Sequence, residues 1–190
     1  MTELYDKIKK IYTGYFEKYK TSQNLLLTGI LYCIDLISVT ELENLRYDLP
    51  KFYRKLETHG DNYDTYQLFM SFILQKLAIK IIYNLPYMLN KPNENSIVSP
   101  HIIFGENITQ LVGFCLITES SNILNILQKK YNKIVNNIGD VQLTQNNIIL
   151  NTKGTYISKE VITHDYYEKC RCLIRKYNNY FELFINESPN

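Results

Sequence analysis

The stretch "PHIIFGENITQLVGFCLIT", residues 100–118, decides the fold that we predict for this chain. Apolar residues fall on most sides of the helix it would form, whereas a surface helix carries a single apolar stripe. Ser99 and Pro100 suit the start of such a helix, because serine is a common cap and proline favours the first turn. We therefore expect residues 100–118 to form the buried centre of the domain. Gly113 is expected at a close helix crossing.

Helical periodicity continues on both sides of this stretch. Apolar side chains recur at helical spacing in 3–20, 25–39, 63–85, 121–137 and 163–185. Pro50 suits the first turn of one more helix. Residues 86–100 contain three prolines and are expected to form a loop. For residues 141–158 a helix and a hairpin both stay open. The predicted fold is all-α, a single domain over residues 1–190 with seven to eight helices around a central hydrophobic helix.

Composition excludes several classes of function. The chain has 190 residues, 45% of them apolar, and a net charge of only +2, so no strong field favours nucleic acid. No run of eighteen apolar residues occurs, and residues 163–185 are amphipathic. A helix of that kind packs on the bundle or lies on a membrane surface, so we expect no membrane-spanning segment and at most a peripheral membrane contact. The four cysteines show no paired framework, which favours a reducing compartment.

Catalysis is not expected. The sequence contains no GxSxG, HExxH or CxxC motif and no glycine-rich phosphate loop. His59, His101 and His164 lie far apart, without an adjacent nucleophile pattern or metal-type spacing to the cysteines. We therefore predict a protein that is not an enzyme and that uses no cofactor and no metal.

A Gly-Asp pair lies within another helical pattern, "FYRKLETHGDNY", residues 52–63. Phe52, Leu56, His59 and Tyr63 share one face. Glycine in a helix interior costs about 1 kcal/mol relative to alanine. The pair at residues 60–61 therefore indicates a position where another helix approaches closely.

The order of these motifs resembles the Bcl-2 family. "FGENITQLVGFC", residues 104–115, is similar to the first homology region of that family, Asn-Trp-Gly-Arg followed by apolar residues and Gly-Phe. Asn107 falls at the position of the family arginine, 46 residues after Asp61, close to the family spacing. "ILNTKGTY", residues 149–156, resembles the second region, and the stripe at 4–19 resembles the fourth. Divergence and composition favour a viral homologue, of the poxvirus or another large-DNA-virus type.

This resemblance implies a Bcl-2-like bundle whose surface groove receives an amphipathic helix. The residues expected to line the groove are Tyr63, Gln67, Phe104, Asn107, Gln110 and Leu111. The implied partners are pro-death Bcl-2 proteins of the host, so the expected function is inhibition of apoptosis. The expected location is the host cytoplasm, peripheral at mitochondria, and a homodimer stays open. The alternative is a Bcl-2-shaped viral adaptor with a closed groove that blocks innate immune signalling of the NF-kappa-B type. A pore-forming, pro-death member is disfavoured.

Two departures from the family affect the expected groove. Asn107 replaces an arginine that would pair with the aspartate of the incoming helix, so a charge-assisted contact becomes at best a neutral hydrogen bond. Glu106 places a carboxylate beside that position. Binding should therefore depend on apolar contacts more than on the aspartate.

Overall fold

The computed structural model describes residues 6, 10–11, 13–14, 16, 25–35, 47, 49–51, 53–54, 63–94, 97–130 and 159–187. Five helices lie within these residues: α2 (Leu25–Asp35), α5 (Tyr63–Tyr83), α6 (Pro100–Phe104), α7 (Glu106–Lys130) and α9 (Lys159–Glu187). The strands described are the two-residue β1 (Asn93–Glu94) and β2 (Ile97–Val98). The prediction of a mainly helical protein is therefore confirmed for the described part. The expected total of seven to eight helices stays a prediction.

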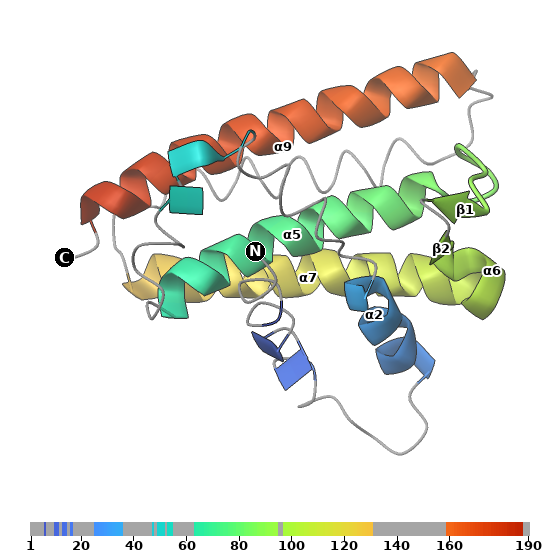
Figure 1. Ribbon diagram of the computed structural model, residues 1–190, viewed down its shortest axis with the longest axis horizontal. Coiled ribbons are helices and arrows are strands. Elements are labelled where there is room, and N and C mark those ends of the chain that lie inside the picture. Colours follow the sequence, from blue (N-terminus) through green and yellow to red (C-terminus); the bar gives the residue numbers. More distant parts are fainter. Residues whose placement is uncertain are drawn as a thin grey trace.

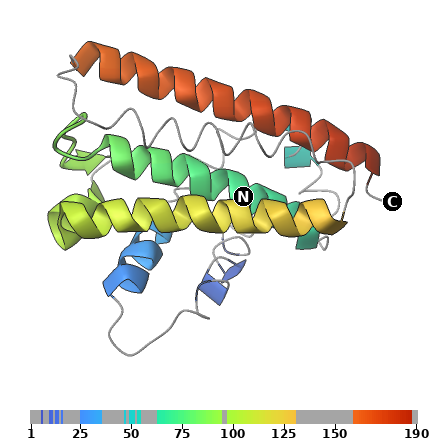
Figure 2. The same cartoon turned by 180° about the vertical axis from the view of Figure 1, so that it is seen from behind.

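Three long helices run along the molecule, and α5 lies between the other two (Figure 1). α7 runs back along α5 after the β1–β2 hairpin, and α9 covers another side of α5. Seen from behind, α7 lies in front of α5, and α2 crosses beneath them near α6 (Figure 2). α2 contacts both α6 and α7.

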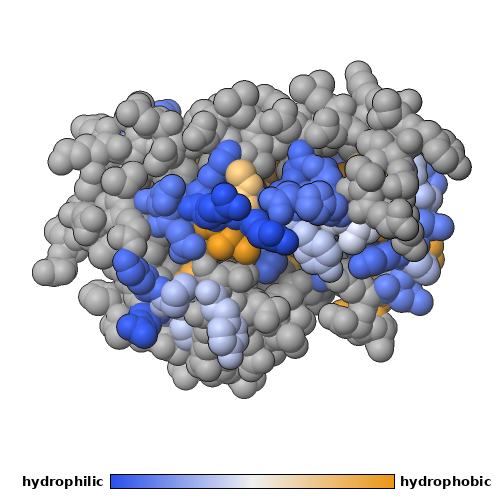
Figure 3. Space-filling view, turned by 90° about the horizontal axis from the view of Figure 1, so that it is seen from above, coloured by the Kyte–Doolittle hydropathy of each residue, from blue (hydrophilic) through white to orange (hydrophobic). Residues whose placement is uncertain are grey.

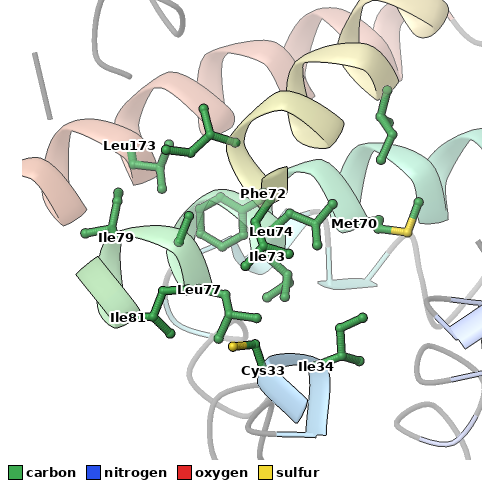
Figure 4. Close-up of a cluster of buried hydrophobic side chains, with 14 of the residues drawn as sticks. Cys33, Ile34, Met70, Phe72, Ile73, Leu74, Leu77, Ile79, Ile81 and Leu173 are labelled. Carbon is green, nitrogen blue, oxygen red and sulfur yellow. The ribbon is translucent and has the colours of Figure 1, made fainter. Parts of the chain in front are cut away.

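The buried centre of this arrangement is α5. All of its 21 residues are buried except Tyr63, Lys76 and Lys80. Figure 4 shows the reason: Cys33 and Ile34 of α2 and Leu173 of α9 converge on the aliphatic and aromatic side chains of α5. A helix covered on several sides needs apolar side chains all round, which is the pattern of residues 63–83.

The expectation that residues 100–118 form one buried central helix is wrong. The stretch is divided at Gly105, whose φ of 80° lies in the left-handed region that glycine adopts readily. Ile102, Ile103 and Leu111 on either side of this break are 56%, 49% and 49% exposed. The apolar residues of this stretch are divided between an inward face, which includes Val112, and an outward face. Apolar composition on all sides therefore did not mean burial on all sides.

The predicted helix boundary near residue 120 is also wrong, because α7 continues without interruption to Lys130. Ser120 is fully buried, and its hydroxyl donates to the Ser71 carbonyl at 2.7 Å. That contact satisfies the hydroxyl inside the bundle, so no helix end is needed there.

Among the glycines that the structure describes, two lie at close helix crossings. A Cβ placed at Gly113 would lie 2.9 Å from Ile82 Cδ1 and Cγ1 of α5, and one at Gly29 would lie 2.9 Å from Val112 Cγ2 of α7. The expected close crossing at Gly113 is therefore confirmed.

The predicted loop at 86–100 is a turn followed by a short hairpin. β1 pairs antiparallel with β2 in the register Asn93↔Val98. Below the hairpin, the Ser99 N–H donates to the Pro92 carbonyl at 2.8 Å, and the Ser99 hydroxyl donates to the Lys91 carbonyl. Ser99 thus precedes α6 as expected, but its side chain closes the hairpin and makes no cap hydrogen bond.

Several predicted features lie outside the described residues. They are the Gly-Asp pair at 60–61, the helix or hairpin at 141–158 and the motif at 149–156. The structure describes only part of the helices predicted over 3–20 and from Pro50 onward. In the first, residues 6, 10–11, 13–14 and 16 are helical, and in the second, residues 50, 51, 53 and 54 are helical.

Candidate functional site

The break at Gly105 creates the candidate site. The Gly105 N–H donates to the His101 carbonyl at 3.1 Å and closes α6. The Gly105 carbonyl then accepts the Thr109 N–H at 3.1 Å and the Thr109 hydroxyl at 2.8 Å, which starts α7. Because the chain changes direction here, Ile102 and Ile103 of α6 lie at the same end of the molecule as the first turns of α7 (Figure 1).

We name the exposed residues at this end the α6–α7 surface: Ile102, Ile103, Asn107 and Leu111. Asn107 and Leu111 are one helical turn apart and share a face of α7. Three of these four residues are aliphatic, and each is about half exposed. Single exposed aliphatic residues are ordinary, whereas a contiguous group of them marks a candidate surface for a partner. Two of the six predicted groove residues, Asn107 and Leu111, belong to this surface.

Phe104 lies beside the α6–α7 surface, but its ring faces α2. The Phe104 and Tyr32 rings meet edge to face, with centroids 5.5 Å apart. The Tyr32 hydroxyl donates to the Val98 carbonyl at 2.7 Å, which also ties β2 to α2. Phe104 therefore holds α6 on the bundle and offers only part of its surface to a ligand.

Gln67 and Tyr63 do not join the α6–α7 surface. Gln67 is 8% exposed and lies on the same face of α5 as Asp64 and Ser71, which bond to Lys130 and Ser120 of α7. Tyr63 is exposed, but it begins α5 at the end of the molecule opposite α6 (Figure 1). About 30 Å of helix separates the two ends. The remaining predicted residue, Gln110, is half-buried on α7.

A buried histidine supports the short helix α6. His101 is 6% exposed, and neither ring nitrogen has a hydrogen-bond partner within the described part of the chain. Burial lowers the pKa of His101, and the negative charge of Glu106 opposes that shift. Burial also raises the pKa of the Tyr87 hydroxyl, and Glu106 adds to this effect. Glu106 therefore acts on the pKa of both His101 and Tyr87, and it is next to Asn107 of the α6–α7 surface.

Sequence reasoning missed a polar junction that joins the three long helices. The Tyr177 hydroxyl of α9 lies 3.0 Å from Ser71 Oγ of α5, and Ser120 of α7 donates to the Ser71 carbonyl. The Tyr177 ring also meets Phe72, with centroids 4.9 Å apart. Asp64, Gln67, Ser71 and Gln75 recur at helical spacing on α5, and this buried polar stripe was the available signal.

A second polar contact joins the end of α5 to the start of α9. The Tyr83 hydroxyl donates to Asp165 Oδ2 at 2.5 Å, and Lys169 Nζ lies 3.8 Å from Asp165 Oδ1. Burial, followed by the hydrogen bond to Asp165, raises the pKa of Tyr83 far above its usual range. Both polar contacts hold helices together, and their hydroxyls already have partners. Among the described residues, no three His, Cys, Asp or Glu side chains are grouped as metal ligands.

Comparison with known proteins adds no family assignment. No protein-family model matches the sequence, and no curated protein matches it. Within the described ranges, no helix is both long enough and apolar enough to cross a membrane.

Proposed function

We propose that this protein is a non-enzymatic inhibitor of host apoptosis that binds the amphipathic helix of a pro-death Bcl-2 protein on its α6–α7 surface. The observation that carries this proposal is the exposure of Ile102, Ile103 and Leu111 within the stretch whose sequence resembles the first Bcl-2 homology region. In this proposal the protein acts in the host cytoplasm, peripherally at mitochondria.

The chemistry of the surface supports an apolar mode of binding. Burial of aliphatic side chains contributes about 25 cal/mol per Å² removed from water, and an amphipathic helix offers a row of apolar anchors for this purpose. Asn107 lies in the first turn of α7, where the helix dipole favours a negative group. Glu106 is in the same turn and opposes that effect. The aspartate of the incoming helix should therefore contribute little.

A second function is favoured by two other observations. Phe104 packs against Tyr32, and Gln67 is buried against the interior, so two predicted groove residues are already engaged within the bundle. A Bcl-2-shaped adaptor that blocks innate immune signalling through another face would have such a closed groove. Under this alternative, the protein binds no pro-death helix.

One titration separates the two functions. Labelled peptides from a panel of pro-death helices are titrated with the purified full-length protein, and fluorescence anisotropy is recorded. The proposal predicts a Kd below about 1 μM for several peptides, equivalent to about 8 kcal/mol of binding free energy. A matched control replaces the apolar anchors of each peptide by serine. If no peptide binds, or if the control peptides bind equally well, the death-suppressing proposal is wrong and the adaptor is favoured.

A further inference from the structure

The imidazole of His101 is buried without a hydrogen-bond partner. The residue is 6% exposed, and neither Nδ1 nor Nε2 has a partner within the part of the chain that the structure describes. A neutral imidazole carries one N–H donor, whereas the protonated imidazolium carries two donors and a positive charge. Burial of an unpaired charge is far more costly than burial of a neutral polar group. The observed position of His101 therefore suits the neutral form alone.

The helix that carries His101 has few anchors. α6 contains only five residues, far fewer than an isolated helix needs for stability. Ile102 and Ile103 are about half exposed, and hydrophobic residues show at this end of the molecule, on the right of Figure 3. Pro100 and His101 are the buried residues of α6, and the Phe104 ring adds an edge-to-face contact with α2. A charge on His101 would therefore act on one of the three anchors that hold α6 on the bundle.

Gly105 provides a hinge between α6 and α7. Its φ of 80° lies in a region that glycine adopts without strain, and glycine leaves this region at little cost. An added Cβ at Gly105 would meet no atom within 4 Å, so side chains do not enclose the backbone here. The first turn of α7 is fixed separately, because the Thr109 N–H and hydroxyl both donate to the Gly105 carbonyl. The hinge therefore allows α6 to move while α7 stays in place.

The groups around α6 include one charge that opposes the effect of burial. α2 and α7 pack against α6, and the titratable groups near it are Tyr32 of α2, Glu106 of α7 and Tyr87 of the turn after α5. Burial raises the pKa of both tyrosine hydroxyls, so they stay neutral near pH 7. The carboxylate of Glu106 attracts an imidazolium, but Glu106 is exposed, and water screens the attraction. Burial is the larger effect and lowers the pKa of His101, so the histidine binds a proton more tightly in water.

We propose that α6 is a pH-sensitive flap, closed on α2 and α7 while His101 is neutral and opened at Gly105 when His101 takes up a proton. Opening exposes the imidazolium to water and moves Ile102 and Ile103 away from the α6–α7 surface. The flap itself does not depend on the proposed function. Its consequence, weaker binding of a pro-death helix in acid, rests on that function, because it needs a helix on this surface.

Proton linkage sets the size of the effect. In the open flap, His101 should have the ordinary histidine pKa of about 6.5. Well above this pH both forms are neutral, and the ratio of open to closed flap is constant. Each pH unit below it raises that ratio by up to about tenfold, until the pKa of the closed form is reached. Hydrogen exchange reports the ratio even when the open flap is a minor population.

Hydrogen–deuterium exchange of the full-length protein, followed by mass spectrometry at about pH 7.5 and 5.5, tests the flap. After correction for the intrinsic effect of pH on exchange, the amides of residues 101–105 should lose protection by about threefold to tenfold at the lower pH. They should also be less protected than α5 at both pH values, because the flap opens without global unfolding. His101→Gln, which stays neutral, should show no such loss, whereas His164→Gln, at an exposed position of α9, should behave like the native protein.

Three results would overturn the proposal. They are unchanged protection of residues 101–105 in the native protein, the same loss in His101→Gln, and protection at pH 5.5 that is equal in this segment and in α5. Glu106→Gln, at an exposed position, gives a second test that does not alter the buried histidine. Without the carboxylate, the closed flap holds an imidazolium less well, so the loss should be at least as large as in the native protein. A smaller loss would also contradict the flap.

A saturating pro-death peptide separates the flap from the proposed function. A bound helix should hold the flap closed and restore the protection of residues 101–105 at pH 5.5. If the free protein loses protection in acid and no peptide binds, the proposed function is wrong and the flap is supported. If peptides bind and the protection of the free protein does not change with pH, the flap alone is wrong.

Discussion

α5 and α7 are neighbours of similar length, but they differ in what their outward faces contact. α5 is buried almost throughout and includes Asp64, Gln67, Ser71 and Gln75 in its buried set. α7 buries Val112, Leu116, Ile123, Leu124 and Leu127 on one side and exposes Leu111 and Ile126 on the other. The central helix thus buries several polar residues among its apolar ones, and the helix with exposed aliphatic residues is at the surface.

This difference indicates which residues are available to bind a partner. Asp64 and Ser71 of α5 have partners on α7 and α9, Lys130 and Tyr177, so these polar groups serve the fold. The aliphatic residues on the outer side of α7 contribute little to the core. Their exposure is unfavourable in water, and binding a partner would remove that penalty.

The largest expected effect compares one leucine from each helix. Leu74 of α5 is fully buried, and Leu111 of α7 is about half exposed. Leu74→Ala should lower the free energy of unfolding by about 2–5 kcal/mol, because it leaves a cavity. Leu111→Ala should lower it by no more than about 0.5 kcal/mol. Urea unfolding followed by circular dichroism measures both values. Equal losses would mean that α7 is as central as α5.

The contact between the two helices is tested at Gly113. Gly113→Val would force side-chain atoms against Ile82 and should lower stability by about 1–3 kcal/mol. Gly14→Ala is the control, because Gly14 is helical and exposed and an added Cβ would meet no atom within 4 Å. Alanine there should stabilise the protein by up to about 1 kcal/mol. Thermal unfolding of both variants and the native protein in the same buffer measures these changes in stability. A stabilised Gly113→Val variant would contradict the close crossing.

A smaller effect is expected at the polar junction. The Ser71 hydroxyl donates to the Leu68 carbonyl at 2.7 Å, so the Tyr177 hydroxyl is the donor to Ser71 Oγ. Tyr177→Phe removes that hydrogen bond and should lower stability by about 1 kcal/mol. Tyr167→Phe, at an exposed position of α9, should change it by less than about 0.5 kcal/mol. If both variants lose the same amount, the junction does not hold α9 to α5.

The smallest effect concerns the pH dependence of stability at α6. Burial lowers the pKa of His101, so the unfolded chain binds this proton more readily than the folded protein. The free energy of unfolding should therefore fall as the pH drops through about 6.5, the ordinary histidine value, and below it. His101→Gln should lose less stability than the native protein between about pH 7.5 and 5. His164→Gln, at an exposed site, is the matched control. If His101→Gln loses more stability than the native protein over this pH range, the prediction is wrong.

Periodicity predicted the elements that have a simple pattern. The expected helices over 63–85 and 163–185 correspond to α5 (Tyr63–Tyr83) and α9 (Lys159–Glu187). Two features depended on tertiary contacts. The helix boundary expected near residue 120 does not form, and the buried Ser120 bonds to Ser71 at that point. Gly105 gave no signal of a break, because glycine is compatible with both a helical and a left-handed conformation.

The candidate site was only partly predictable for the same reason. The resemblance to the Bcl-2 motif predicts Asn107 and Leu111, and both lie on the exposed face of α7. Ile102 and Ile103 were assigned to the core because an unbroken apolar helix would have buried them. Gln67 was assigned to a groove, but its face of α5 packs inside the bundle. One-dimensional spacing gives the face of a helix and leaves open which neighbour covers that face.

The most direct test of the central claim is the affinity of one pro-death helix for three proteins: the native chain, Ile103→Glu and Ile126→Glu. Both substitutions place the same charge at an isoleucine that is about half exposed, one on α6 and one near the far end of α7. If the α6–α7 surface receives the helix, Ile103→Glu should raise the Kd at least tenfold, equivalent to about 1.4 kcal/mol, and Ile126→Glu should leave it unchanged. An unchanged Kd for Ile103→Glu, with binding by the native chain, would contradict the claim.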